Sequence, residues 1–295
     1  MNVISTSPSS TEILYALGVE PVAVSHACDY PAAAETLPSI DVSKVDAEAS
    51  ADRHEPVRSA TADGHLYRMD AETIDEVDPD LIVTQGVCGV CAVDDVLVDE
   101  TLESLAVDPE VVALNANRFS DVFECIRTVG TATGAEARAE ELIGELHDRI
   151  GTVEQSIASM DRPRVAVIEW MDPVRSAGSW VPDIVETAGG EYGLVDPGNR
   201  SEPTEWETIR EYDPEVLVVA PCGFDADRTR RQFDELAHRP GWDSLAAVRK
   251  DRVYILDGSA YLTRWTPRLV DAVERLAALC HPETCGPAPD DVVTR

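Results

Sequence analysis

The sequence is short of positive charge and of long apolar runs, and each shortage excludes a class of protein. Lysine occurs only at Lys44 and Lys250, and 24 basic residues stand against 56 acidic ones, for a net charge of −32. The phosphate backbone of a nucleic acid repels a chain with this much negative charge. We therefore expect no nucleic-acid partner. No stretch approaches the roughly 20 apolar residues that span a bilayer, so we expect no membrane span.

The chain also opens without a secretory signal. Met1-Asn2 leads directly into Val3-Ile4-Ser5, with neither the basic region nor the apolar region of a signal peptide. We therefore expect a cytoplasmic protein. Its seven cysteines are scattered, and in a reducing compartment they are expected to be free thiols.

Motifs of the common catalytic sites are missing as well. The sequence contains no Gly-x-Ser-x-Gly, no Walker loop and no Gly-x-Gly-x-x-Gly. We therefore expect a protein that is not an enzyme. We also expect it to be a monomer and to hold no resident cofactor.

The acidic residues are spread along the whole chain. This pattern is typical of a surface that stays hydrated in concentrated salt, where self-repulsion is screened. Binding of a cationic partner is the alternative. Because no segment concentrates the charge, salt adaptation is favoured.

One segment occurs twice, at an offset of 135 residues: Thr73–Thr84 returns as Thr208–Val219. Each copy predicts the end of a helix, an Asp-Pro turn and a short apolar strand. Two copies at so long a period favour two similar lobes over a solenoid. Two facing lobes form a cleft, where small ligands commonly bind.

Strands alternate with helices through both halves, which predicts an α/β fold of two Rossmann-like lobes. A continuous apolar stripe predicts one long, rigid helix over about 136–160 that joins the lobes, with the ligand cleft between them. The expected divisions are an N-terminal lobe, connecting helices, a C-terminal lobe and a flexible tail, at residues 1–118, 119–161, 162–282 and 283–295.

Ligands of open α/β sheets bind at the carboxyl ends of the strands. Several of the few aromatic residues lie at those ends, where a purely structural role is least expected. The set favours a cleft for an apolar ligand.

Cys88-Gly89-Val90-Cys91 is the sharpest local motif. It predicts a pair of soft metal ligands, completed by Cys28, His26 or Cys222, or a redox dithiol. Small buried residues are the third interpretation. A cytoplasmic metal-binding or redox protein that uses Cys88 and Cys91 is thus the alternative function.

Several motifs, in order along the chain, resemble the helical-backbone periplasmic-binding-protein family, and most closely its vitamin B12 binders. They are Ser7–Glu12, Val22–Ser25 with Asp29-Tyr30-Pro31, Asp78–Ile82, Asp172-Pro173, Gly189–Glu191 and Arg264–Arg268. The resemblance implies binding of cobalamin, or of a related iron-siderophore or haem chelate, for an importer. Cleft aromatics that stack on a macrocycle would supply affinity.

On this resemblance and the strand-end pattern, we predict a ligand site of ten residues. They are Ser9, His26, Tyr30, Gln85, Trp170, Trp180, Phe224, Tyr261, Arg264 and Trp265. Importer-linked members dock to the membrane subunit of an ABC importer through a surface glutamate on each lobe. The corresponding position of the second lobe, just before Arg264, is Thr263.

Overall fold

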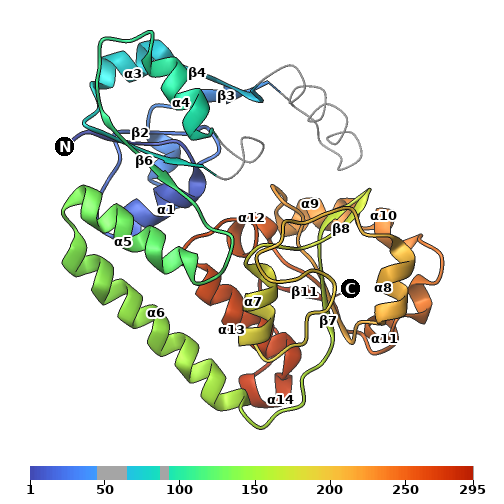
Figure 1. Cartoon of the computed structure of the whole chain (residues 1–295). Helices are drawn as coiled ribbons and strands as arrows, with labels where there is room; N and C mark the ends of the chain where they lie inside the picture. The colour runs from blue at the N-terminus through green and yellow to red at the C-terminus, as the bar shows by residue number, and fades with distance from the viewer. Residues whose placement is uncertain (45–64, 87–92, 295) are drawn as a thin grey trace. The chain divides into compact units, whose positions relative to one another are not determined.

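The computed structural model describes residues 1–44, 65–86 and 93–294, which form two compact units (Figure 1). The first unit comprises Met1–Ala116 and Ser120–Gly144, and the second comprises Asn117–Phe119 and Glu145–Arg295. The helix α6 (Glu136–Ile157) contributes to both units. The structure thus divides the expected connecting segment 119–161 between the two units, with Ser120–Gly144 in the first and the residues from Glu145 onward in the second.

The first unit contains a four-stranded parallel sheet in the order β2-β1-β5-β6. Its strands are β1 (Val3–Ser5), β2 (Ala23–Val24), β5 (Leu81–Gln85) and β6 (Glu110–Leu114). In the central strand β5, the successive residues Leu81, Ile82 and Val83, which alternate between the two faces, are all buried. Both sheet faces are therefore covered, as a parallel sheet requires.

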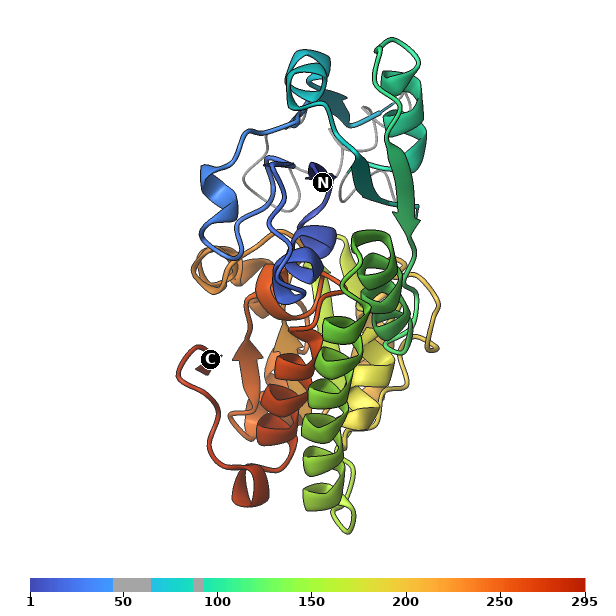
Figure 2. The same cartoon turned by 90° about the vertical axis from the view of Figure 1, so that its left-hand side faces the viewer.

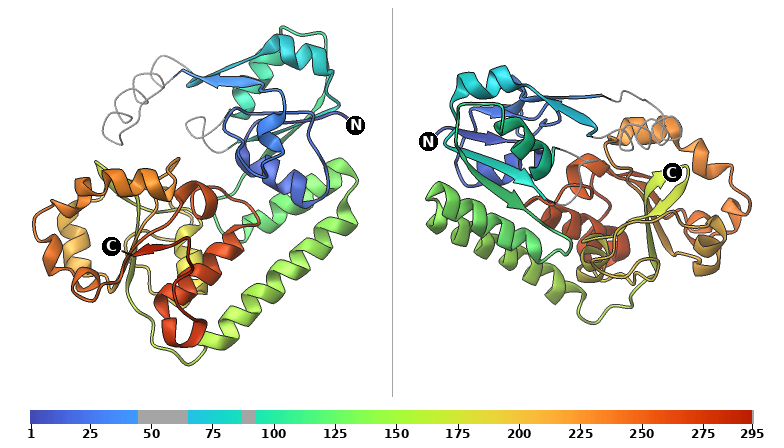
Figure 3. Two further views of the ribbon diagram at one scale, coloured as in Figure 1. Left: turned by 180° about the vertical axis from the view of Figure 1, so that it is seen from behind. Right: turned by 45° about the horizontal axis from the view of Figure 1, so that its top comes forward.

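Helices cover both faces of this sheet (Figures 1 and 3). They are α1 (Pro8–Ala16), α3 (Ala71–Val77), α4 (Asp95–Leu102) and α5 (Asp121–Thr133), with α3 and α4 on one face and α1 and α5 on the other. The side chain of Ser7 caps α1 by accepting a hydrogen bond from the Ser10 backbone N–H at 3.2 Å.

The first unit also contains a two-stranded hairpin, which local periodicity does not predict in the polar sequence of residues 41–69. Strands β3 (Asp41–Ser43) and β4 (Tyr67–Met69) pair in antiparallel register. Ile40, Leu66, Tyr67 and Met69 are buried with the sheet residues of this unit. The hairpin residues are therefore part of the core of this unit.

The second unit contains a five-stranded mixed sheet in the order β11-β10-β9-β7-β8. Its strands are β7 (Val165–Met171), β8 (Val174–Ser176), β9 (Val216–Val219), β10 (Val253–Ile255) and β11 (Val293–Thr294). The inner strands β7, β9 and β10 are parallel, and the two edge strands are antiparallel to their neighbours. As expected for strands buried on both faces, β9 and β10 are unbroken apolar runs, and the run of β7 is interrupted only by Glu169.

Helices again lie on both faces of the sheet. One side holds α8 (Trp206–Tyr212), α9 (Ala226–Gln232), α10 (Asp234–Ala237), η2 (Trp242–Ser244) and α11 (Ala246–Arg249), and the other holds α7 (Val181–Thr187) and α13 (Leu269–Cys280). Figure 2 shows α13 beside α6, and Arg149 of α6 joins them through Asp271 and Glu274, each at 2.6 Å.

The segment after α13 differs from the expected flexible tail. It contains α14 (Pro282–Cys285) and returns to the sheet, where β11 forms the edge next to β10. Val292 is only 7% exposed. The chain is therefore ordered through Thr294 by contacts that are distant in sequence.

The repeat has the same local structure in both units. The C-cap residues of helices α3 and α8 are Asp78 and Asp213, whose dihedral angles are nearly identical (φ 47°, ψ 68° and φ 46°, ψ 66°). Aspartate tolerates this left-handed conformation better than most residues. The proline that follows each one cannot continue the helix, so the chain turns into β5 and β9.

The helix α6 confirms the predicted long helix, which ends at Ile157 instead of residue 160. Leu142, Ile143, Leu146, Val153 and Ile157 of the apolar stripe are buried, whereas Met160 lies beyond the helix and is 38% exposed. Among the described residues, no helix is both long and apolar enough to cross a membrane.

Candidate functional site

The carboxyl end of β1 in the first unit is surrounded by buried hydroxyl groups. The Ser5 and Ser10 hydroxyls are 2.6 Å apart, and Thr11 donates to the Ser5 hydroxyl at 2.8 Å. Thr6 donates to the Thr84 hydroxyl at the end of β5, also at 2.8 Å. These groups satisfy one another, so they fix the strand ends without needing water.

The loop after β2 is held by Asp41, which sequence reasoning missed. Its carboxylate is buried and accepts hydrogen bonds from the Ser25 hydroxyl at 2.9 Å and the His26 backbone N–H at 2.7 Å. The His26 Nδ1 lies 3.0 Å from the same carboxylate. Asp41 therefore orients the imidazole, whose side chain is 34% exposed.

The other predicted residues of the first unit differ in accessibility. Ser9 lies in α1 and Gln85 ends β5, and both are buried at 5% and 4% exposure. Tyr30 is 48% exposed, which is unusual for so large a side chain. Of these three, Tyr30 alone presents a large face to a molecule in solution.

Two indole groups of the second unit are fixed by backbone carbonyls. The Trp170 Nε1 in β7 donates to the Asp172 carbonyl at 3.1 Å, and the Trp180 Nε1 donates to the Leu262 carbonyl at 2.8 Å. Both side chains are half-buried. The polar edge of each ring is therefore satisfied while part of its apolar surface stays accessible.

Phe224 and Trp265 are in a different position. Phe224 is fully buried in the core of the second unit, and the Arg228 guanidinium lies 3.9 Å from its ring centroid. Trp265 is 4% exposed. In this structure neither residue offers an open ring face, so a contact with ligand would require them to move.

Tyr261 lies in the short helix α12 (Gly258–Tyr261), and the half-buried Thr263 and Arg264 follow it. The Tyr261 hydroxyl donates to the Asp291 carboxylate at 2.6 Å. Burial, followed by that hydrogen bond, raises the pKa of Tyr261 to about 12. The Thr263 hydroxyl donates to the Gly258 carbonyl at 2.9 Å, so it is directed to its own turn.

Glu169 precedes Trp170 in β7 and carries the perturbed carboxyl group of this strand end. Loss of solvent contact raises its pKa, and the nearby Ser201 side chain and the charge of Arg175 oppose that shift. The Arg175 Nη2 also donates to the Ser201 carbonyl at 3.0 Å. The group binds a proton more readily than an exposed glutamate does.

The thiols that are described do not assemble into a metal centre. Cys28 is buried, with its sulfur 3.1 Å from the Thr11 hydroxyl, and Cys222 is half-buried. Cys88 and Cys91 lie outside the described residues. Within the described ranges, no three His, Cys, Asp or Glu side chains are grouped to hold a metal ion.

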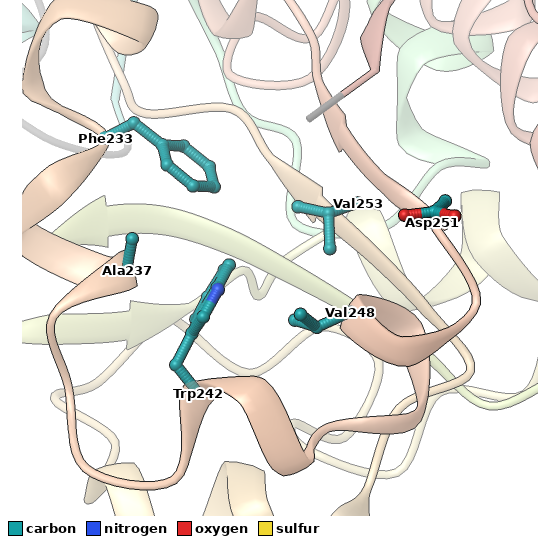
Figure 4. Close-up of a pocket in the computed structure, with 6 residues that line it drawn as sticks. All are labelled: Phe233, Ala237, Trp242, Val248, Asp251 and Val253. Atoms are coloured by element: carbon teal, nitrogen blue, oxygen red, sulfur yellow. The ribbon is translucent and has the colours of Figure 1, made fainter.

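An apolar cavity of about 250 Å³ lies elsewhere in the second unit (Figure 4). Phe233, Trp242, Val248 and Val253 converge on it, with Asp251 at its side. Val253 is the first residue of β10, so the cavity is at the amino ends of the parallel strands. The predicted ligand residues of this unit lie toward the opposite ends.

Comparisons with known proteins agree with the fold. A model of the family described as "Periplasmic binding protein" matches residues 3–260. The ABC transporter substrate-binding lipoprotein YvrC of Bacillus subtilis is 25% identical over 290 residues, which cover 96% of this chain and 80% of the relative.

Two solved structures illustrate the likeness. The periplasmic haem-binding protein RhuT from Roseiflexus sp. RS-1 has a TM-score of 0.70 at 22% identity, covering 96% of this chain and 98% of the other. The periplasmic vitamin B12-binding protein BtuF of Vibrio cholerae has a TM-score of 0.68 at 20% identity, covering 95% and 96%. At these identities the likeness establishes the fold.

The comparisons correct the expected location. The cytoplasmic assignment rested on the first residues of the sequence, Met1–Ser5. The matched family consists of periplasmic binding proteins, and the Bacillus relative is a lipoprotein. The cytoplasmic assignment is therefore wrong, because the start of a chain is a poorer guide to location than the family to which its fold belongs.

Proposed function

The chain belongs to the periplasmic binding protein family, and from that premise we propose that it binds cobalamin or another large metal chelate, such as haem, for an ABC importer. A family of binding proteins implies capture of a ligand without chemical conversion. The cytoplasmic thiol-dependent alternative has no support from the family. The class of ligand is proposed from the side chains at the strand ends.

The pair Trp170 and Trp180 carries the proposal. A planar macrocycle is bound through its faces, and rigid aromatic rings supply that contact with little conformational entropy to lose. Each indole is held by one hydrogen bond from its Nε1 to a backbone carbonyl, at 3.1 and 2.8 Å. Tyr30, 48% exposed, is the corresponding residue of the first unit.

Further polar groups fit a ligand with polar or charged edges. His26 is oriented by Asp41, and Arg264 lies in the turn after α12. An imidazole can contact a metal or a propionate, and a guanidinium pairs readily with a carboxylate. These two residues are the proposed contacts for the ligand's edge.

Titration of the full chain with cyanocobalamin and, separately, with haemin tests the proposal. The readouts are quenching of tryptophan fluorescence and heat by calorimetry, in about 1 M NaCl to screen the acidic surface. We expect a dissociation constant below about 10 μM for one of the two. If both exceed about 100 μM, binding is weaker than about −5.5 kcal/mol and the proposal is rejected.

A further inference from the structure

The C-terminal segment contacts the rest of the second unit through its backbone and through its side chains. Its strand β11 pairs with β10, with Val293 opposite Ile255 and Thr294 opposite Tyr254. Just before this strand, Val292 is buried and Asp291 contacts side chains from two helices. The segment is thus part of the structure that surrounds α12.

Asp291 forms a closed triangle with Tyr261 of α12 and Arg275 of α13. Its Oδ2 accepts from the Tyr261 hydroxyl at 2.6 Å and from the Arg275 Nη2 at 2.8 Å. The Arg275 Nη2 also donates to the Tyr261 hydroxyl at 2.9 Å, and the guanidinium lies 4.0 Å from the tyrosine ring centroid. Charge-assisted hydrogen bonds of this kind are the stronger ones.

The pKa directions agree with a triangle that stays charged. Partial burial alone would raise the pKa of Asp291, but the hydrogen bonds from Arg275 and Tyr261 lower it. Burial and the bond to Asp291 raise the pKa of Tyr261 to about 12. The carboxylate therefore remains the acceptor and the phenol the donor at neutral pH.

Other residues of the turn around Tyr261 are fixed by hydrogen bonds and close packing. The Leu262 carbonyl accepts from the Trp180 indole at 2.8 Å, and the Thr263 N–H donates to the Gly258 carbonyl at 2.9 Å. At Gly258, an added Cβ would collide with the backbone carbonyls of Ala220 and Pro221. Tyr261 is therefore the point at which the C-terminal segment acts on this turn.

We propose that Asp291 is a positioning residue for the ligand site. It holds Tyr261, and through Tyr261 it fixes the turn that presents Arg264. Tyr261 then acts through its hydroxyl group on Asp291, and not as a ligand contact. The part of this inference that concerns ligand rests on the proposed function, whereas the part that concerns the turn does not.

Hydrogen exchange of the full chain without ligand tests the turn. In Asp291→Asn we expect the amides of Tyr261, Leu262 and Thr263 to exchange about tenfold faster, because loss of the charged acceptor favours local opening. Asp290→Asn is the matched control, since it removes the same charge from the adjacent exposed residue. Equal exchange in the two variants would overturn the proposal.

Affinity for the chelate tests the second step. With whichever of cyanocobalamin or haemin binds, Tyr261→Phe and Asp291→Asn are each expected to weaken binding about fivefold. The double variant is expected to bind the chelate no more weakly than either single variant, because both substitutions act on the same contact between Tyr261 and Asp291. Additive losses would mean that Tyr261 touches the ligand itself, which contradicts the proposal.

The two tests separate this inference from the proposed function. If neither chelate binds the unmodified chain, the proposed function fails, and the exchange rates still decide whether Asp291 holds the turn. Thermal unfolding of each variant shows whether the chain is folded. A variant with normal stability, fast exchange at 261–263 and unchanged affinity would overturn the positioning role.

Discussion

The two units present different chemistry at the carboxyl ends of their sheets. In the first, the Ser5, Ser10 and Thr11 hydroxyls bond to one another in the interior. In the second, the indole N–H groups of Trp170 and Trp180 donate to backbone carbonyls, Trp170 also contacts the Phe224 ring, and both side chains stay partly exposed. Hydroxyl groups that hydrogen-bond to one another have a structural role. Indole rings that are held at the N–H edge keep apolar surface that a ligand can contact. We therefore expect most ligand contact to come from the second unit.

The largest expected effect acts on both units and comes from the net charge of −32. Salt screens charge over about 3 Å at 1 M and about 10 Å at 0.1 M, so dilution strengthens repulsion among surface carboxylates. Between 1 M and 0.1 M NaCl we expect the midpoint of thermal unfolding to fall by about 10 °C, or roughly 3–4 kcal/mol. Calorimetric scans would measure it. An unchanged midpoint would contradict salt adaptation.

The next effect belongs to the first unit alone. Asp41→Ala removes the acceptor for Ser25 and His26 and leaves their donors unsatisfied in the interior, so we expect a loss of about 3 kcal/mol in the free energy of unfolding. Urea unfolding measures it. Asp75→Ala, an exposed aspartate of α3, is the control and should change stability by less than about 0.5 kcal/mol.

Asp41 also shows where sequence reasoning stops. The two Asp-Pro turns, the alternating strands and the long helix follow from neighbouring residues, and the structure confirms them. The pairing of Asp41 with Met69 joins residues on either side of a polar stretch. The periodicity of a short window does not predict such a pairing, because the two partners are distant in sequence.

The same reason applies to the candidate site. The sequence placed aromatic residues at strand ends, yet Phe224 is fully buried, since the core in which it packs comes from several distant helices. Asp291 was assigned to a flexible tail, although its partners Tyr261 and Arg275 lie 30 and 16 residues away. Such contacts are set by the tertiary fold and leave no local pattern.

A smaller effect is expected from Glu169 in the second unit. Its folded-state pKa is raised above the ordinary value of 4.5. The folded chain therefore binds this proton more tightly than the unfolded chain, and its charge costs stability at neutral pH. As pH falls through the raised pKa toward 4.5, the unmodified protein should regain that stability.

Glu169→Gln should remove this pH dependence and raise the unfolding free energy at pH 7, because a neutral side chain does not lose stability through burial of its charge. Urea unfolding between pH 4.5 and 7.5 measures both. Glu154→Gln, at an exposed position of α6, should keep the slope of the unmodified protein. Identical slopes in the two variants would show that Glu169 is not the group responsible.

The last effect in this series does not change the free energy of unfolding. It concerns the reactivity of one buried thiol in each unit. Burial raises the pKa of Cys125 and of Cys280 to about 12. Because the thiolate is the reactive form, alkylation by iodoacetamide at pH 8 should be roughly 1,000-fold slower in the folded protein than in urea. Peptide mapping gives the rate at each cysteine, and fast labelling of either one in the folded state would contradict its burial.

The central claim is that fixed indoles of the second unit bind the chelate, and one comparison tests it most directly. Trp170→Phe and Trp206→Phe each replace an indole whose N–H donates to a backbone carbonyl, but Trp206 stacks on Trp242 beside the apolar cavity. Calorimetric titration with the bound chelate should show about tenfold weaker binding for Trp170→Phe and no change for Trp206→Phe. Equal affinities in the two variants would contradict the account.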